Sequence, residues 1–112
     1  GTRGWDSTEE HSPETTNEKI FTRELSRLHN SIAKCKSSMK YKIAMLHFPP
    51  FDSNGKPNEF FEIIKAHEIN TCIYGHLHGE EGHKNVREGL IEGVYLHCVS
   101  SDYLDFKLKR II

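Results

Sequence analysis

The chain has 112 residues and a mass of 12.9 kDa, with 36% hydrophobic and 28% charged residues. These values fit one ordinary globular domain, and we expect neither a membrane-spanning nor a disordered protein. Lys and Arg number 15 against 16 Asp and Glu, a net charge of -1, so no global positive field attracts nucleic acid or an anionic membrane. Two features are unusual: eight histidines in so short a chain, and Gly1 rather than Met at its start.

The three cysteines are widely spaced, form no CxxC pair and follow no secretory leader. This pattern favours a reducing, cytoplasmic location. Each cysteine lies in an apolar run, so we expect small buried side chains without a metal or redox role at Cys35, Cys72 and Cys98. No stretch approaches the roughly 20 apolar residues that span a membrane.

The first third of the chain predicts a short strand and a long helix. Residues 1–5 suit a strand, and residues 6–13 are polar. Ser12 is a suitable N-cap and Pro13 suits the first helical position, so we expect a helix from there to about Lys36. Its apolar residues recur every three or four positions and form one buried face: Phe21, Leu25, Leu28, Ile32 and Cys35.

The middle of the chain predicts two buried strands joined by a helix. Residues 42–46 and 71–74 are short apolar runs, each bounded by polar or turn-forming residues. The loop 48–58 is rich in Pro, Asn and Gly, and its last residue can cap a helix over 59–67. This order predicts a βαβ unit with two parallel strands.

The last third predicts a loop and two more strands. Residues 75–89 are rich in Gly and charge, whereas 93–100 and 103–111 are rich in β-branched and aromatic residues. The link between these two strands is short, so we expect them to be antiparallel neighbours, with Asp102 and Tyr103 in their turn. The overall expectation is an α/β fold with a mixed sheet.

Three histidines fall where the buried strands end. His47 closes the first strand, and His76 and His78 lie in the GHLHG segment 75–79 that closes the second. Because open α/β folds place their sites at the carboxyl edge of parallel strands, we expect these rings to converge. In an extended HxH segment the two side chains share a face, and the flanking glycines allow a sharp turn. Three imidazoles suit Zn, Mn or Fe.

These residues resemble a known family. LHFPP (46–50), YGHLHG (74–79) and CVSSDYLDF (98–106) are similar to the carboxyl-terminal half of calcineurin-like metallophosphoesterases, in particular the small bacterial predicted phosphohydrolases, and GTRGW (1–5) fits the same subgroup. The resemblance implies half of a β-sandwich flanked by helices. It also implies a phosphohydrolase that uses two divalent ions, Mn, Fe or Zn, to hydrolyse phosphomonoesters or phosphodiesters.

The resemblance assigns roles residue by residue. It implies that His47 and His76 bind one metal and that His78 binds the other. In two-metal chemistry the ions share a hydroxide that attacks phosphorus and neutralise charge on the phosphoryl oxygens. Arg3, Trp5 and His83 are candidates for substrate binding, since Arg pairs with phosphate and Trp offers a stacking surface. The competing expectation is a packed strand end for Arg3 and Trp5 and a solvated loop position for His83.

The chain also departs from the family. It has no Asp-x-His, Gly-Asp-x-x-Asp or Gly-Asn-His motif, and these supply the bridging carboxylate, the Asn ligand and the catalytic histidine. We therefore expect residues 1–112 to be the carboxyl-terminal part of a longer phosphoesterase domain, inactive alone and with no catalytic residue of its own. The expected partners are its amino-terminal half and a phosphate ester, with dimerisation or strand exchange if the apolar surface stays exposed.

Two other functions compete with this one. A non-catalytic module can hold one structural or sensory metal, and a fourth protein ligand such as His83 or a cysteine would favour it. A nuclease half is disfavoured because no basic stripe is visible. The other histidines are expected on the surface, without a role in chemistry: His11, His29, His67 and His97.

Overall fold

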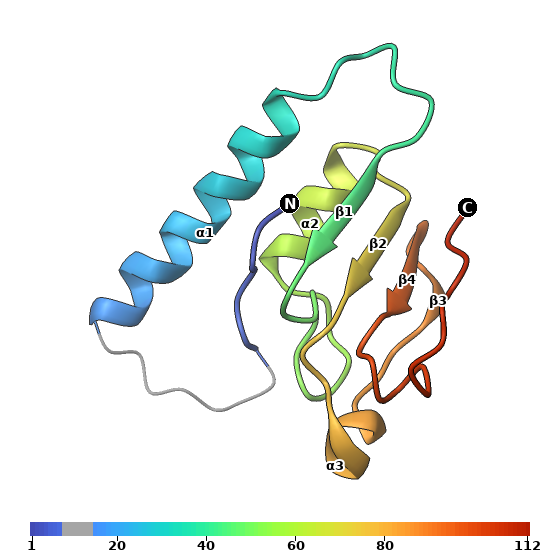
Figure 1. Cartoon of the computed structure of the whole chain (residues 1–112). Helices are drawn as coiled ribbons and strands as arrows, with labels where there is room; N and C mark the ends of the chain where they lie inside the picture. The colour runs from blue at the N-terminus through green and yellow to red at the C-terminus, as the bar shows by residue number, and fades with distance from the viewer. Residues whose placement is uncertain (8–14) are drawn as a thin grey trace.

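The computed structural model describes residues 1–7 and 15–112 and shows a mixed α/β arrangement of helices around one sheet (Figure 1). The expected cap at Ser12 and Pro13, and His11, lie outside the described residues. The elements are α1 (Thr15–Ala33), β1 (Ile43–Leu46), α2 (Glu59–Ala66), β2 (Thr71–Tyr74), α3 (Gly79–Lys84), β3 (Gly89–Ile91) and β4 (Val94–Cys98).

The four-stranded sheet has the order β1-β2-β4-β3. β1 is parallel to β2, β2 is parallel to β4, and β3 is antiparallel to β4. The arrowheads of β1, β2 and β4 in Figure 1 therefore point toward the same edge, the one at which α3 lies. This carboxyl edge is where an open α/β sheet places its site.

The predicted βαβ unit is confirmed. Asn58 caps α2 because its side-chain oxygen accepts hydrogen bonds from the backbone N–H of Phe60 and Phe61, at 3.1 and 3.3 Å. In the parallel pair the last residue of β1, Leu46, is in register with the last residue of β2, Tyr74. The two strands therefore end level, and the residues that follow each of them emerge side by side.

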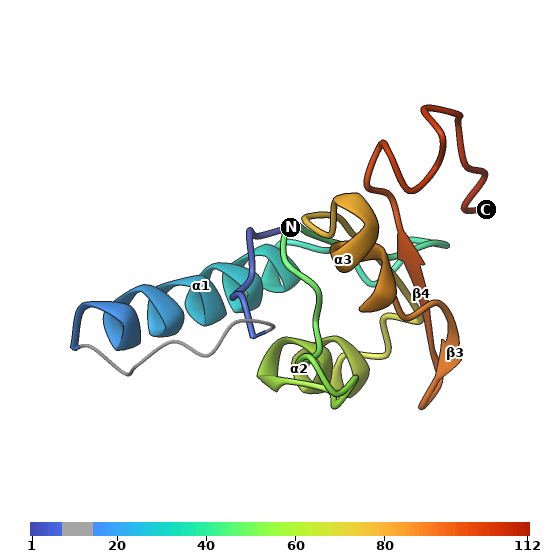
Figure 2. The same cartoon turned by 90° about the horizontal axis from the view of Figure 1, so that it is seen from below.

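The core lies between one face of the sheet and the helices. Alternate residues of the strands point into it, as the period of two requires. They meet Phe60, Phe61 and Ile64 of α2, which are fully buried, and Leu28 of α1. Figure 2 shows α2 on one side of the sheet and the C-terminal segment on the other.

The opposite face of the sheet carries several exposed apolar side chains. We use the name open face for the apolar residues on this side of the sheet: Ile43, Met45, Ile73, Leu90 and Tyr95. Met45 is 58% exposed, Tyr95 50% and Leu90 60%. Thr71 and His97 lie on the same face, in register with these residues. Clustered exposed apolar side chains commonly mark a contact site for another layer or chain.

The prediction of a strand over residues 103–111 is wrong. Residues 101–106 form turns instead, in which Phe106 N donates to Ser101 O at 2.8 Å, and Asp105 and Phe106 both have positive φ. The reason is that β4 is central: it is hydrogen-bonded to β2 on one edge and to β3 on the other, so neither edge is left for another strand. Its antiparallel neighbour is β3, which begins at the last residue of the expected loop 75–89 and was not predicted as a strand.

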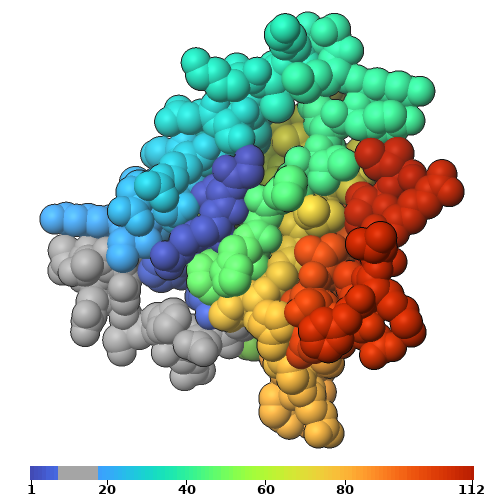
Figure 3. Space-filling model, in the orientation of Figure 1, coloured from blue at the N-terminus to red at the C-terminus, as the bar shows by residue number. Residues whose placement is uncertain are grey.

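The N-terminal segment runs between α1 and β1 (Figure 3). It forms one parallel bridge, between Thr2 and Leu46, rather than the expected strand. Phe48 N donates to Arg3 O at 2.9 Å, so the segment follows β1 toward its carboxyl end. The Thr2 hydroxyl donates to the fully buried carboxylate of Glu24 on α1 at 2.6 Å, which anchors the segment between helix and sheet.

Two details of α1 differ from expectation. The helix ends at Ala33, near but before Lys36, and Cys35 lies in the turn that follows. Cys35 is therefore exposed, which corrects its predicted burial, whereas Cys72 and Cys98 are buried as predicted. Within the described part of the chain, no helix combines the length and the apolarity needed to cross a bilayer.

Candidate metal centre

The ends of β1 and β2 bring two predicted histidines together. His47 follows β1 and His76 follows Gly75 at the end of β2, and their ring centroids lie 5.2 Å apart. The backbones are joined at this point, because Gly75 N donates to His47 O at 3.1 Å. The level ends of the parallel pair thus place two imidazoles next to each other.

A tight turn centred on His76 orients the imidazole ring of this residue. Leu77 N donates to Gly75 O at 2.9 Å and His76 has φ 72, a three-residue turn in a backbone region that non-glycine residues rarely adopt. The expectation of an extended HxH segment is therefore wrong. Such strain, on the order of 1–3 kcal/mol, is typical of functional sites and persists because neighbours hold it. Here the buried Leu77 anchors the turn.

His78 is held by a carboxylate that follows β4. Its Nδ1 lies 2.6 Å from Asp102 Oδ1, and Gly79 N donates to Asp102 Oδ2 at 2.7 Å. The Gly79 N–H and the His78 ring together hold the pKa of Asp102 well below its usual range, so this acid stays charged. His78 itself is 57% exposed, and its other nitrogen is not engaged by Asp102.

A second carboxylate lies beside His76. Asp6 Oδ2 is 3.2 Å from His76 Nε2, and the Asp6 side chain is only 12% exposed. Neither Asp6 nor Asp102 was predicted as a site residue, and Asp102 was expected only to form a turn. The sequence offers only an indirect reason to expect such carboxylates: a histidine that binds a metal commonly has a carboxylate on its second ring nitrogen.

His83 joins the cluster from α3, a helix that the sequence did not predict. Its Nε2 lies 3.2 Å from Asp102 Oδ2, but without the geometry of a hydrogen bond, and that atom is buried. The ring packs edge-on against Tyr103, with centroids 5.4 Å apart. His83 therefore lies against the turn after β4 rather than in a solvated loop.

The electrostatics around His47 favour a neutral ring. Partial burial lowers the pKa of His47, and the nearby imidazoles of His76 and His78 and the guanidinium of Arg3 lower it further, against a smaller opposing effect of Asp6. A neutral imidazole has the lone pair that a metal ion needs, whereas a protonated ring has none.

The two N-terminal candidates for substrate binding differ in their surroundings. The Arg3 guanidinium stacks over Phe48, 5.4 Å from its ring centroid, and is close enough to His47 to affect its pKa. It therefore lies beside the histidine pair, and its charge also acts on Glu24. Trp5 packs edge-on against Phe21 of α1, with centroids 5.6 Å apart, which is the packed position that was the competing expectation.

The histidine pair has dimensions that suit a shared ion. With metal–nitrogen bonds of about 2.1 Å, two imidazoles on one ion have ring centres on the order of 5 Å apart. The 5.2 Å between His47 and His76 matches this value, whereas the exposed pair His29 and His67 is wider, at 6.0 Å. The spacing of His47 and His76 is therefore compatible with two imidazole ligands on one divalent ion.

A closed site with three or four protein ligands is not found in the part of the chain that the structure describes. No group of three or more His, Cys, Asp and Glu side chains there is arranged to hold one ion. Cys72 and Cys98 are in the core, with no exposed surface, and His83 contacts Asp102. The arrangement is a pair of histidines with a third beside it, and it leaves ligand positions open.

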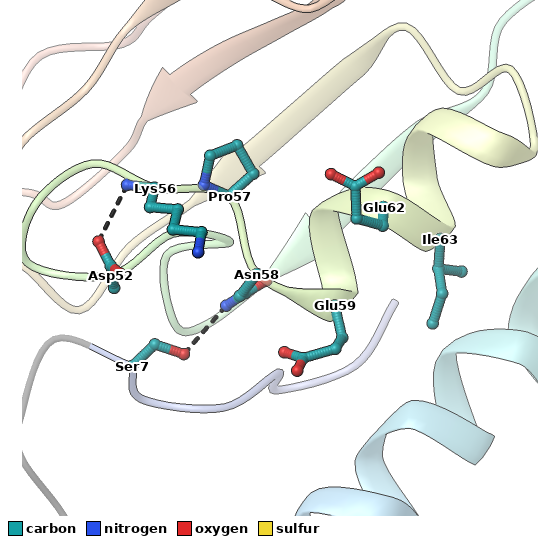
Figure 4. Close-up of a pocket in the computed structure, with 8 residues that line it drawn as sticks. All are labelled: Ser7, Asp52, Lys56, Pro57, Asn58, Glu59, Glu62 and Ile63. Carbon is teal, nitrogen blue, oxygen red and sulfur yellow. Dashed lines mark hydrogen bonds between the residues drawn. The ribbon is translucent and has the colours of Figure 1, made fainter.

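One open pocket of about 710 Å³ lies at the N-terminus of α2 (Figure 4). It is lined by Ser7, Asp52, Lys56, Pro57, Asn58, Glu59, Glu62 and Ile63. Two of its polar side chains have structural partners: Asp52 accepts from the backbone N–H of Asn54 and Lys56, and Asn58 caps the helix and donates to Ser7. None of the strand-end histidines lines it, so it is not part of the candidate metal centre.

No protein-family model, curated protein sequence or solved structure gives a significant match to this chain.

Proposed function

We propose that this chain is the carboxyl-terminal part of a dinuclear metal-dependent phosphohydrolase, in which His47 and His76 bind one divalent ion and His78 binds the second. The observation that carries the proposal is the pair of imidazoles 5.2 Å apart at the level ends of two parallel strands. The resemblance of the LHFPP and YGHLHG segments to metallophosphoesterases supplies the reaction class.

The chain's own residues have distinct tasks in this proposal. The His76 turn and the contact from Asp102 to His78 fix the directions of the metal-binding rings. Arg3, beside His47, attracts and orients the phosphoryl group of a phosphomonoester or phosphodiester. Two bound ions, of Mn, Fe or Zn, would supply a hydroxide nucleophile and neutralise charge on the phosphoryl oxygens. The bridging carboxylate and a catalytic histidine would come from a different segment of the protein.

The open face supports a second layer. Exposed Met45, Tyr95 and Leu90 lie on the face of the sheet opposite the helices. In a β-sandwich this face packs on a second sheet, and we propose that the amino-terminal half of the same domain provides it. A sheet covered on both faces would also remove the exposed apolar surface.

The state of the cysteines bears on the cellular location of the protein. All three cysteines are free thiols, and two of them are buried in the core. Burial raises the pKa of the Cys72 thiol to about 12, so this thiol is unreactive at physiological pH. We propose a reducing, cytoplasmic environment on the basis of this cysteine pattern.

An assay of hydrolysis tests the reaction class. The chain is incubated with Mn²⁺ and an aryl phosphate or a bis-aryl phosphate, beside a longer form of the same polypeptide that carries the Asp-x-His, Gly-Asp-x-x-Asp and Gly-Asn-His motifs upstream of Gly1. We expect turnover by the longer form, and its loss when His76 is replaced with alanine. The 112-residue chain should show little turnover. Equal rates for the two forms, or a coding sequence without these motifs, would refute the proposal.

A further inference from the structure

The two histidines of the HxH segment are each approached by a carboxylate, but on opposite ring nitrogens. Asp6 Oδ2 lies 3.2 Å from Nε2 of His76, and Asp102 Oδ1 lies 2.6 Å from Nδ1 of His78. The two acids come from nearly opposite ends of the chain, one before α1 and one after β4. The ring nitrogen that does not face a carboxylate is therefore Nδ1 in His76 and Nε2 in His78.

The protonation of each ring follows from its partner. A neutral imidazole has one N–H donor and one bare nitrogen, and an ionised carboxylate only accepts hydrogen bonds. The nitrogen that faces the carboxylate therefore carries the proton, and the other carries the lone pair. We infer that Asp102, through its hydrogen bond to His78 Nδ1, is a positioning residue that makes His78 present a bare Nε2 to an incoming metal ion. The ion-pair contact of Asp6, 3.2 Å from His76 Nε2, favours a bare Nδ1 on His76 in the same way.

Backbone contacts hold Asp102 in addition to its contact with His78, and contacts of neighbouring residues hold the segment that carries Asp6. Asp102 accepts the Gly79 N–H at 2.7 Å, and its turn is closed by the hydrogen bonds from Leu104 N to Ser100 O and from Phe106 N to Ser101 O. The segment that carries Asp6 is anchored by the contact of Thr2 with buried Glu24. A carboxylate fixed by its own backbone can orient a ring, whereas a mobile surface acid cannot.

The effect of a carboxylate on the tautomer is best defined at His78. An unconstrained neutral imidazole prefers the tautomer with the proton on Nε2, so a proton on Nδ1 needs a specific acceptor. Asp102 supplies that acceptor at 2.6 Å. His83 also faces Asp102, but its Nε2 approaches the other oxygen, which already accepts the Gly79 N–H. His83 thus does not compete for the oxygen that holds His78.

The tautomers of His76 and His78 can be determined in the absence of a metal ion. Long-range ¹H–¹⁵N spectra of the ¹⁵N-labelled chain distinguish protonated from bare ring nitrogens, and they should be recorded at about pH 8.5, two units above the usual histidine pKa of ~6.5. We expect His78 with a protonated Nδ1 and His76 with a protonated Nε2. Asp102→Ala should return His78 to the Nε2–H form, and Asp102→Glu should restore Nδ1–H in part. A wild-type His78 with its proton on Nε2 would overturn the inference.

The matched control is Asp105→Asn. Asp105 lies three residues beyond Asp102, and its side chain is exposed and pairs with Lys107. This variant should leave both tautomers unchanged. If Asp102→Ala fails to fold, Asp102→Asn keeps one of the two acceptor oxygens and should give a mixture of tautomers. The wild-type spectrum decides the inference even if neither variant folds.

The consequence for metal binding rests on the proposed function and is measured separately with Co²⁺ alone, by visible absorption. Loss of a carboxylate behind a ligating histidine typically lowers metal affinity by about 10–100-fold. We expect losses in this range for Asp6→Asn and Asp102→Ala, and less than twofold for Asp105→Asn. If the tautomers are as inferred but the wild-type chain binds no Co²⁺, the proposed function fails and the positioning role stands. If Co²⁺ binds equally to wild type and to both variants, the positioning role in metal binding is contradicted.

Discussion

Replacing His47 with alanine should lower the affinity of the chain for Co²⁺ or Zn²⁺ by about 100-fold. Structural zinc sites with four ligands are worth roughly 10–16 kcal/mol, or about 3 kcal/mol per ligand, which corresponds to about a factor of 100. His47 and His76 are the two rings that come together, so His76→Ala should have an effect of the same size. Titration with Co²⁺, followed by competition with a chelator, measures both.

His97→Ala is the control for His47→Ala. His97 lies on β4, the third parallel strand, but before its end, and it is in register with Ile73 rather than with a strand-end histidine. Its loss should change Co²⁺ affinity by less than a factor of two. An effect of His97→Ala equal to that of His47→Ala would show that binding is a general property of the surface histidines, and the proposed centre would be wrong.

Replacing Glu24 with glutamine should lower the free energy of unfolding at pH 7 by about 2 kcal/mol, because a buried carboxylate loses hydrogen bonds to a charged partner and to a hydroxyl. Glu24 is fully buried and lies 2.6 Å from Thr2 Oγ1 and 2.7 Å from Arg27 Nη1. Urea denaturation measures the difference. Glu18→Gln, an exposed position on the same helix, should be neutral.

The effect of Glu24 depends on pH in a defined direction. Burial alone would raise the pKa of Glu24, but the Thr2 hydroxyl and the Arg27 and Arg23 guanidinium groups lower it below the usual value of 4.5. The carboxylate therefore stabilises the fold fully above about pH 4.5, and this contribution is lost as the pH falls through the lowered pKa of the folded state. Wild type and Glu24→Gln should therefore converge in stability as the pH falls below 4.5 and through the lowered pKa of Glu24. A difference that widens in acid would contradict the assigned contacts.

The sequence predicted the part of the fold that depends on local patterns. Apolar runs at 42–46 and 71–74 and the Asn58 cap predicted β1, β2 and α2 within one residue at each end. Because the two runs belong to one βαβ unit, their parallel pairing and the approach of His47 to His76 followed.

The rest depends on contacts that are distant in sequence. The run 103–111 alternates like a strand, but the edges of β4 are already paired, and only the full topology reveals that. α3 has six residues and no apolar face, so periodicity gives no signal for it. Asp6 and Asp102 reach the histidines from residues near the two ends of the chain, and no local spacing links them.

The central claim is that His47, His76 and His78 are the metal ligands, and a titration of the ¹⁵N-labelled chain with Zn²⁺ tests it most directly. The ring nitrogens of all histidines are followed in long-range ¹H–¹⁵N spectra. We predict saturable shifts at the bare nitrogens of His47 and His76 first and of His78 at higher Zn²⁺, with His97 and the exposed His29 and His67 pair unchanged over this range. Shifts that begin at His29 and His67, or no saturable shift at His47 and His76, would contradict the claim.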